Sequence, residues 1–253
     1  MVKIDKVILS STDSPTYLEF WPYIAKAWKK LLGPDAEVIL GHLSNIPTPR
    51  LDNYGTVLQF PSIEGMLDKN SSKIIRTIIA ARYPDSYCLM TDVDMLPLNA
   101  NYFISNSEFA SDNNIVLYSS DQSGHPAKHP ICYMLAKGKI FKELINPDNL
   151  EENQLLKQWA STPEYIFNAP TFSDETLYKG FFLRWGIMDK NKDRVVRLKR
   201  GWTNNIAHER IDRAFWFIDQ EKLQRGEYID AHLLRPLTSN FNRIKPLFDY
   251  LGI

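Results

Sequence analysis

The sequence predicts an α/β fold in which helices flank a mostly parallel central sheet. Short apolar runs of strand length alternate with segments whose apolar residues recur at helical spacing. The chain opens in the order strand, helix, strand with short links, which is how a parallel sheet begins. Its 253 residues are 44% hydrophobic and 24% charged, a composition typical of a globular protein with one full core.

The first strand and helix are the clearest elements. Residues 6–10 predict a strand, and a polar loop then leads to a helix that begins at Pro15. Pro22 should kink this helix or separate a short first turn, and Gly33 with Pro34 ends it. The core-facing stripe of the helix is Trp21, Ile24, Ala25, Trp28, Leu31 and Leu32.

Two more strands, over 36–40 and 56–60, precede a helix over 70–83. Lys73 and Arg76 share one face of its first two turns. There the helix dipole disfavours cations by roughly a few tenths of a kcal/mol. An anionic ligand bound there would make this placement favourable. The alternative is that both side chains are simply solvated.

A pair of acids follows the next apolar strand, 87–91. Asp92 and Asp94 are one residue apart, so a turn can bring both carboxylates to one point. Like charges that close resist desolvation, and a divalent metal with oxygen ligands would relieve the repulsion. The alternative is an ordinary solvated turn, in which Asp is common.

The second half of the chain predicts strands over 115–119, 131–136 and 194–200, and helices over 139–144 and 151–160. A further helix should begin near Ser173, with Asp174 and Glu175 in its first turn, where acids are favoured by the helix dipole alone. The aromatic segment 214–217 is expected to lie in the core.

Charge and composition exclude several partners. The 30 basic residues balance the 30 acidic ones, so neither nucleic acid nor an anionic membrane is an expected partner. No apolar run approaches the ~20 residues that span a bilayer, and the start of the chain lacks a signal-peptide pattern. Cys88 and Cys132 lie in apolar runs and predict buried free thiols, which indicates a reducing compartment, the cytoplasm.

With Asp92-Val93-Asp94 placed after a fourth strand, the chain resembles the GT-A glycosyltransferases, and more loosely the compact glycosyltransferase domains encoded by large DNA viruses of algae. The resemblance implies a GT-A fold and a hexosyl- or pentosyltransferase that moves a sugar from a nucleotide diphosphate donor, a UDP-sugar, to a glycan or other hydroxyl acceptor. It also implies a single domain over 1–253, with a donor half over 1–120 and an acceptor half over 121–253.

The resemblance assigns a metal site that would hold Mn²⁺ or Mg²⁺. Asp94 would be a direct ligand, and Asp92 would bind the metal or the ribose hydroxyls. Such enzymes often take a further ligand from a late histidine, for which His232 is the first candidate and His208 the second. Imidazole beside two carboxylates suits Mn²⁺.

The resemblance also assigns nucleotide-sugar contacts. They are expected from Val93 between the two acids, from Lys73 and Arg76, and from the loop after the first strand, at the carboxyl end of the sheet. The loop residues are Ser10, Ser11 and Thr12. The chain has no Gly-rich phosphate loop, so the metal should carry much of the phosphate charge.

For catalysis, an inverting enzyme needs a carboxylate that deprotonates the acceptor hydroxyl. Asp174 is the expected base and Glu175 the second choice, whereas a retaining enzyme would need no such base. The aromatic residues Tyr178, Trp185 and Trp202 could stack on sugars or pack in the core.

Three other functions fit parts of the pattern. A phosphatase of the haloacid dehalogenase type carries D-x-D on its first strand, whereas here about three strands precede the motif. A sugar-nucleotide nucleotidyltransferase should have a Gly-rich basic loop after its first strand, which this chain lacks. A non-catalytic carbohydrate-binding module would bind neither metal nor nucleotide.

Overall fold

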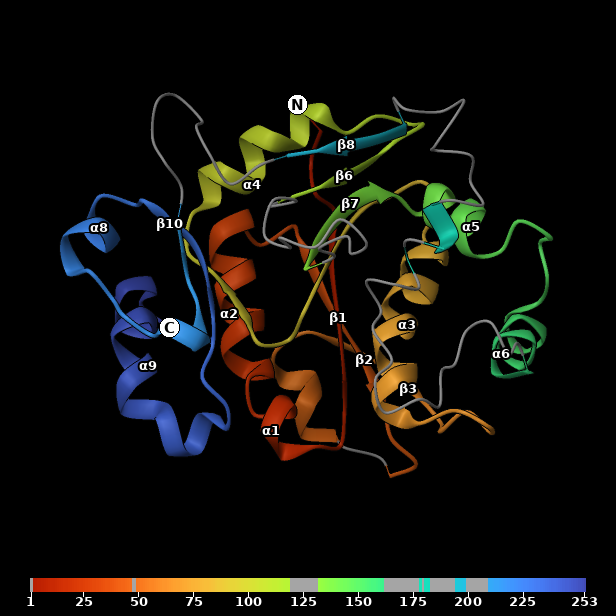
Figure 1. Ribbon diagram of the computed structural model, residues 1–253, viewed down its shortest axis with the longest axis horizontal. Coiled ribbons are helices and arrows are strands. Elements are labelled where there is room, and N and C mark those ends of the chain that lie inside the picture. Colours follow the sequence, from red (N-terminus) through yellow and green to blue (C-terminus); the bar gives the residue numbers. More distant parts are fainter. Residues whose placement is uncertain are drawn as a thin grey trace.

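A seven-stranded sheet forms the centre of the protein (Figure 1). The structure is a computed structural model that describes residues 2–46, 49–118, 132–161, 178, 180–182, 194–198 and 209–253. The strands of this sheet are β1 (Lys6–Thr12), β2 (Glu37–Leu43), β3 (Thr56–Phe60), β4 (Tyr87–Thr91), β6 (Ile115–Leu117), β7 (Tyr133–Lys137) and β8 (Val195–Arg197).

The strand order is β3-β2-β1-β4-β7-β6-β8. All neighbouring strands run parallel except at β7, which pairs antiparallel with both β4 and β6. The predicted α/β fold with a mostly parallel sheet is therefore confirmed, and each strand predicted in the described part of the chain is present.

A second sheet joins the C-terminal part of the chain to the segment after the acid pair. Its strands are β5 (Met95–Pro97), β10 (Tyr228–His232) and β9 (Glu209–Ile211), in the order β5-β10-β9. β10 runs antiparallel to β5 and parallel to β9. His232 lies opposite Met95, so this pairing sets a late histidine beside the acid pair.

Helices cover both faces of the central sheet, as Figure 1 shows for α2 and α3 on either side of β1. One face carries α2 (Trp21–Leu32), α4 (Ala100–Asn106) and α9 (Leu237–Leu251), and the other carries α3 (Asp68–Ala81), α5 (Gly138–Ile145) and α6 (Glu152–Ser161). The shorter helices are α1 (Pro15–Leu18), α8 (Gln220–Gln224) and 3₁₀ turns over Pro49–Asn53, Ser107–Phe109 and Arg213–Phe215. No helix among the described residues has the length and apolar character to cross a bilayer.

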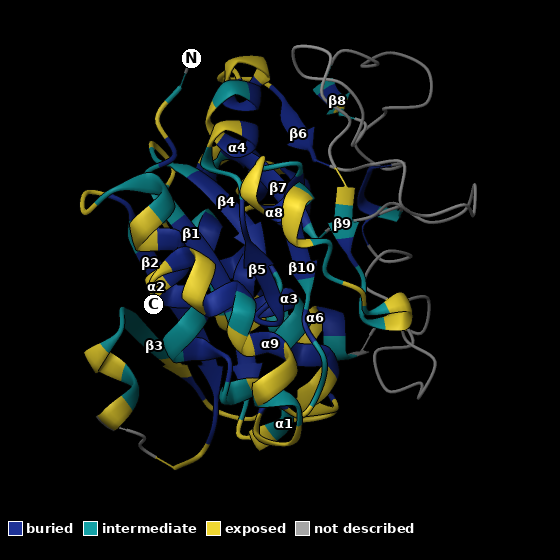
Figure 2. Cartoon of the chain, turned by 90° about the vertical axis from the view of Figure 1, so that its left-hand side faces the viewer, coloured by how far each residue is buried: buried dark blue, intermediate teal, exposed yellow. Residues whose placement is uncertain are grey.

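Alternating side chains of the strands divide the core in two. Val7 and Leu9 of β1 belong to the cluster under α2, whereas Ile8 between them belongs to the cluster under α3. Figure 2 shows the inner strands of the sheet largely buried, with most exposed residues on the outer sides of the helices and in loops. The edge strands β3 and β8 each carry an exposed residue as well.

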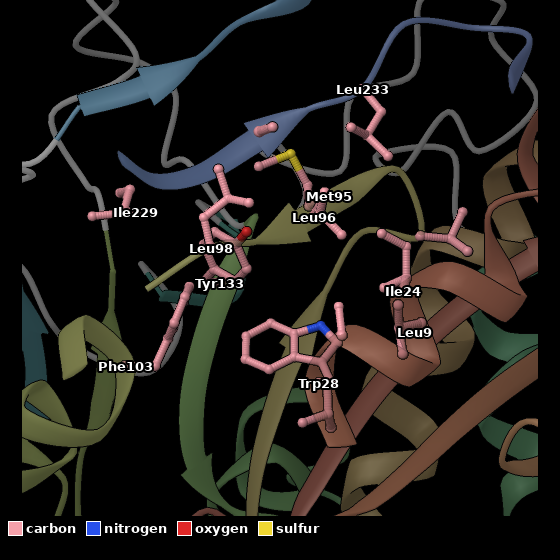
Figure 3. Close-up of a cluster of buried hydrophobic side chains, with 14 of the residues drawn as sticks. Leu9, Ile24, Trp28, Met95, Leu96, Leu98, Phe103, Tyr133, Ile229 and Leu233 are labelled. Carbon is pink, nitrogen blue, oxygen red and sulfur yellow. The ribbon is translucent and has the colours of Figure 1, made fainter. Parts of the chain in front are cut away.

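Aromatic rings fill the centre of the cluster under α2 (Figure 3). The Trp28 and Phe103 ring centroids lie 4.9 Å apart in an edge-to-face arrangement. Phe103 meets Tyr133 of β7 in the same way, also at 4.9 Å. Edge-to-face contacts between aromatic rings stabilise the fold by about 0.5–1.5 kcal/mol beyond the burial of their area. The three rings therefore tie α2, α4 and β7 together.

Two helix boundaries and one core assignment differ from the sequence-based expectations. Pro22 lies in the first turn of α2 and separates it from α1, which is the second of the two outcomes expected for this proline. α3 begins at Asp68, two residues before the expected start. The prediction that 214–217 is core is wrong, because Phe215 is 86% and Phe217 is 71% exposed. Only Trp216 between them packs against the core, since this short turn presents its residues to different sides.

Both cysteines are free thiols, as predicted, with Cys88 buried and Cys132 half-buried. Burial raises the pKa of Cys88 to about 12, so this thiol stays protonated at neutral pH. Cys88 therefore serves as a small apolar residue of β4.

Replacing Gly138 by alanine should destabilise the fold. A Cβ at this position would lie 2.1 Å from the carbonyl oxygen of Tyr83 and 2.3 Å from that of Ala80, and backbone cannot move aside as a side chain can. We expect the free energy of unfolding to fall by about 1–3 kcal/mol or more, measured by urea denaturation. The neighbouring Lys139→Ala, an exposed change, should stay within about 0.5 kcal/mol of the original protein. Equal stability of the two variants would contradict the close approach of α5 to the end of α3.

Candidate functional site

A cavity of about 470 Å³ opens where β1 and β4 end. The carboxyl ends of parallel strands meet at one edge of a sheet, so the segments after them gather there. β10 and the residues around it complete the wall. The lining residues are Ser10, Ser11, Thr12, Ser14, Tyr17, Lys69, Ser72, Lys73, Arg76, Asp92, Val93, Asp94, Arg213, His232 and Arg235.

The cavity brings together every donor-site and metal-site residue expected from the sequence, apart from the alternative ligand His208. These residues are Ser10, Ser11, Thr12, Lys73, Arg76, Asp92, Val93, Asp94 and His232. They come from four separated stretches of the chain, so their convergence is a property of the fold and not of sequence proximity.

One face of α3 lines the cavity. Lys69, Ser72, Lys73 and Arg76 are spaced i, i+3, i+4 and i+7, which places them on the same side of the helix. Arg76 is buried and forms an ion pair with the partly exposed Asp92. The alternative that Arg76 is simply solvated is therefore wrong.

Asp94 is the centre of a cluster of basic side chains. Only 7% of its side chain is exposed, and its Oδ2 accepts a hydrogen bond from Nη1 of Arg213 at 3.0 Å. Nε2 of His232 lies 3.4 Å from the same oxygen, and Nε of Arg235 lies 3.5 Å from it. All three basic side chains come from the C-terminal part of the chain, so they compensate the burial of the carboxylate.

Backbone and side-chain contacts fix this arrangement. The amide of Leu233 donates to the carbonyl oxygen of Asp94 at 2.9 Å, which holds the end of β10 against the acid pair. Three residues before Leu233, buried Asp230 accepts two hydrogen bonds from Arg210 of β9, both 2.6 Å. Burial alone would lower the pKa of Arg210, but the facing Asp230 carboxylate raises it well above its usual range.

Tyr17 of α1 positions Arg235. The guanidinium lies over the Tyr17 ring at 4.6 Å from the centroid, and Nη1 donates to the Tyr17 hydroxyl. Burial lowers the pKa of Arg235 from its usual value, yet a guanidinium remains charged at neutral pH. The cavity wall thus carries a fixed positive charge beside Asp94.

The cavity has an excess of positive charge. Among the described residues, the lining has five Lys and Arg side chains, Lys69, Lys73, Arg76, Arg213 and Arg235, and two carboxylates, those of Asp92 and Asp94. Low-dielectric walls lined with one sign of charge attract ligands of the other sign. The arrangement therefore favours an anionic ligand, in a protein whose overall charge is balanced.

The donor atoms next to Asp94 suit a divalent metal in part. Among the described residues no group of three His, Cys, Asp or Glu side chains is assembled for a metal. Asp94 Oδ2 and His232 Nε2 nevertheless face each other at 3.4 Å, and Asp92 lines the same cavity. A carboxylate oxygen with an imidazole nitrogen is a donor set that Mn²⁺ accepts. Asp92 would have to turn from Arg76 to become a third ligand.

Several expected residues lie outside the described part of the chain. These are Asp174, Glu175, Trp185, Trp202 and His208. Tyr178 is described and is fully buried. Its hydroxyl is hydrogen-bonded to the Thr77 hydroxyl, and its ring centroid lies 5.7 Å from that of Phe181. Sugar stacking by Tyr178 is therefore excluded, and core packing is its role.

Sequence reasoning missed Tyr17, Lys69, Ser72, Arg213 and Arg235. Lys69 and Ser72 share the helix face of Lys73, and an extension of that face by one turn would have found them. Arg235 lies three residues after His232, and a positive charge so close to the predicted metal ligand was a signal that could have identified it. Arg213 carries no signal in its own neighbourhood, because only the pairing of β9 with β10 brings its segment to the cavity.

Comparisons with known proteins show likeness in structure. No protein-family model matches the sequence, and no curated protein matches it. The galactosyltransferase LgtC, solved with donor and acceptor sugar analogues, superimposes with a TM-score of 0.52 at 12% identity, covering 98% of this chain and 95% of LgtC.

The glycosyltransferase GlyE of Streptococcus pneumoniae TIGR4 superimposes with a TM-score of 0.56 at 11% identity. All of this chain is covered, but it spans only 61% of GlyE. The apo form of GlyE gives the same TM-score and identity. At such identities the likeness is one of fold, and the predicted GT-A glycosyltransferase fold is thereby confirmed.

Replacing Asp230 by asparagine should lower the stability of the fold around the cavity. Arg210 would lose the charge of its partner in a buried position, and breaking such a pair costs about 3–5 kcal/mol. We expect that decrease in the free energy of unfolding by urea denaturation. Asp249→Asn, which removes a charge from an exposed pair with Lys245, should cost less than about 1 kcal/mol. An Asp230→Asn variant as stable as Asp249→Asn would contradict the role of this pair.

Proposed function

We propose that the protein is a metal-dependent glycosyltransferase that moves a sugar from a nucleotide diphosphate donor, a UDP-sugar, to a hydroxyl of a glycan or other acceptor. The observation that carries the proposal is the cavity that gathers Asp92, Asp94 and His232 among five basic side chains. The fold that holds this cavity is the one found in LgtC and GlyE.

The donor would be bound by charge and by the end of β1. A diphosphate needs several cations, and Lys69, Lys73 and Arg235 face the cavity from two sides. Arg235 is already oriented by Tyr17, so little side-chain entropy is lost when it binds a phosphate. The nucleoside would lie along Ser10–Thr12, and a volume of about 470 Å³ is within the usual range for ligand sites.

The proposed metal site consists of Asp94 and His232, with Asp92 as the third ligand or as the residue that binds the ribose. Mn²⁺ bound there would act as a Lewis acid on the departing diphosphate. Arg213 and Arg235 hold positive charge at the same place and stabilise the same leaving group. The donor half of the proposed site is thus built from charges that the fold fixes in advance.

The acceptor hydroxyl has to lose a proton during transfer. In the inverting mechanism that we propose, Asp174 removes this proton as general base, and Glu175 is the second choice. The proposal for these two residues rests on the resemblance of their sequence to the acidic pair of inverting glycosyltransferases.

Nucleoside diphosphates should stabilise the protein when Mn²⁺ is present. A ligand at one hundred times its dissociation constant adds about 2.7 kcal/mol, which for a chain of this size raises the melting temperature by roughly 5–10 °C. The measurement is a thermal-shift panel of nucleoside diphosphates and nucleotide sugars with and without Mn²⁺. We expect UDP and UDP-sugars to give the largest shifts.

Asp94→Asn should abolish the shift that depends on Mn²⁺, because the carboxylate is a proposed ligand. Asp112→Asn is the matched control, since Asp112 is a surface carboxylate paired with Lys137. If no nucleoside diphosphate stabilises the original protein with Mn²⁺, the proposed function is wrong. If Asp94→Asn retains the full shift, the metal assignment is wrong.

Asp174→Ala should separate binding from chemistry. The variant should bind the donor with unchanged affinity by thermal shift, and its transfer rate should fall by about 10²–10⁴-fold. The rate is measured as release of nucleoside diphosphate in the presence of an acceptor. Transfer at the original rate would show that Asp174 is not the base, and Glu175→Ala would then be the next variant.

A further inference from the structure

Two phenylalanine rings in the segment that follows Arg213 point into solvent. Phe215 is 86% and Phe217 is 71% exposed, whereas the other rings exposed in the described part of the chain stay below half. A single exposed apolar residue is ordinary, but Phe is among the residues most often buried. Two such rings within three residues therefore call for a physical explanation.

The segment that carries the rings is anchored on both sides. Asp212 Oδ1 accepts a hydrogen bond from the amide of Ala214 at 2.8 Å, which closes the turn before Phe215. Trp216 and Ile218 pack against the core, and the amide of Asp219 donates to the Tyr228 hydroxyl at 3.2 Å. The fold thus fixes the backbone and turns both rings outward.

The same turn reaches into the cavity. Arg213, two residues before Phe215, donates to Asp94 at 3.0 Å and lines the cavity wall. Two residues span at most about 7 Å, so the backbone of Phe215 lies within that distance of the backbone of Arg213. The turn that carries the rings therefore begins at a residue of the cavity wall.

We propose that Phe215 and Phe217 form an acceptor platform, which stacks on the apolar face of a sugar ring in the glycan acceptor. This inference rests on the proposed function. Transfer requires the acceptor hydroxyl to lie against the donor sugar, hence at the rim of the donor cavity. A pyranose offers a face of C–H groups, and an aromatic ring buries such a face favourably. The rings carry no charge, which suits a neutral sugar, whereas the basic cavity suits a diphosphate.

Fluorine NMR of the whole chain labelled with 4-fluorophenylalanine tests the platform directly. Phe215→Leu and Phe217→Leu assign the two signals, and Phe109→Leu assigns an exposed control ring outside this turn. The probes are methyl glycosides of glucose, galactose, mannose and xylose, added with UDP and Mn²⁺. At least one glycoside should shift the signals of Phe215 and Phe217 and leave that of Phe109 unchanged.

Kinetics give the second readout. The double variant Phe215→Ala/Phe217→Ala should raise the KM for the glycoside that shifts the signals by about threefold to tenfold per ring. Hydrolysis of the donor without acceptor and the thermal shift by UDP with Mn²⁺ should stay unchanged, as should all three readouts in Phe109→Ala. The unchanged thermal shift also shows that the variant is folded.

Four results would overturn the platform. In the first, no glycoside shifts the fluorine signals of Phe215 and Phe217, and in the second, the signal of Phe109 shifts equally. In the third, only vesicles of phosphatidylcholine and phosphatidylglycerol shift the two signals, and in the fourth, the two signals change only with protein concentration. The third would indicate a lipid surface and the fourth a second copy of the chain. The proposed function fails separately, when UDP with Mn²⁺ does not stabilise the original protein.

Discussion

At the carboxylate of Asp94, the segment after β4 meets the C-terminal part of the chain. It is nearly buried, and a buried carboxylate is stable only with compensating charge and hydrogen bonds. That compensation comes from Arg213, His232 and Arg235, more than a hundred residues further along the chain. The pairing of β10 with β5 and the bond from Leu233 to the Asp94 carbonyl hold these groups in place. The small sheet thus brings three basic side chains to one carboxylate oxygen.

This constraint connects stability with the proposed chemistry. Arg213 and Arg235, which balance the charge of Asp94, also face the cavity, where a diphosphate would supply new negative charge. Arg76 of α3 forms an ion pair with the other acid, Asp92, in the same cavity. The site is therefore charged and ordered without a ligand, which would reduce the cost of binding the proposed donor and would stabilise its leaving group electrostatically.

The sequence predicted the parts that depend on local patterns. Alternating and helical periodicity located the strands and helices, and parallel strand ends explain why Ser10, Asp92 and Asp94 converge. The antiparallel direction of β7 and the position of Arg213 depend on long-range pairing, which no local pattern encodes. The rings of Phe215 and Phe217 were expected in the core because composition alone favours burial. Their exposure follows from the turn, which only the structure reveals.

The central claim is that Asp94 and His232 hold a metal together with a nucleoside diphosphate. Electron paramagnetic resonance of Mn²⁺ measures this directly, because the six-line signal of the free ion weakens when the ion is bound. We expect the protein with UDP to remove this signal, beyond what UDP alone removes, in proportion to the protein concentration, and His232→Ala with UDP to leave most of it. If the protein with UDP leaves as much free Mn²⁺ signal as UDP alone, Asp94 and His232 do not hold the metal.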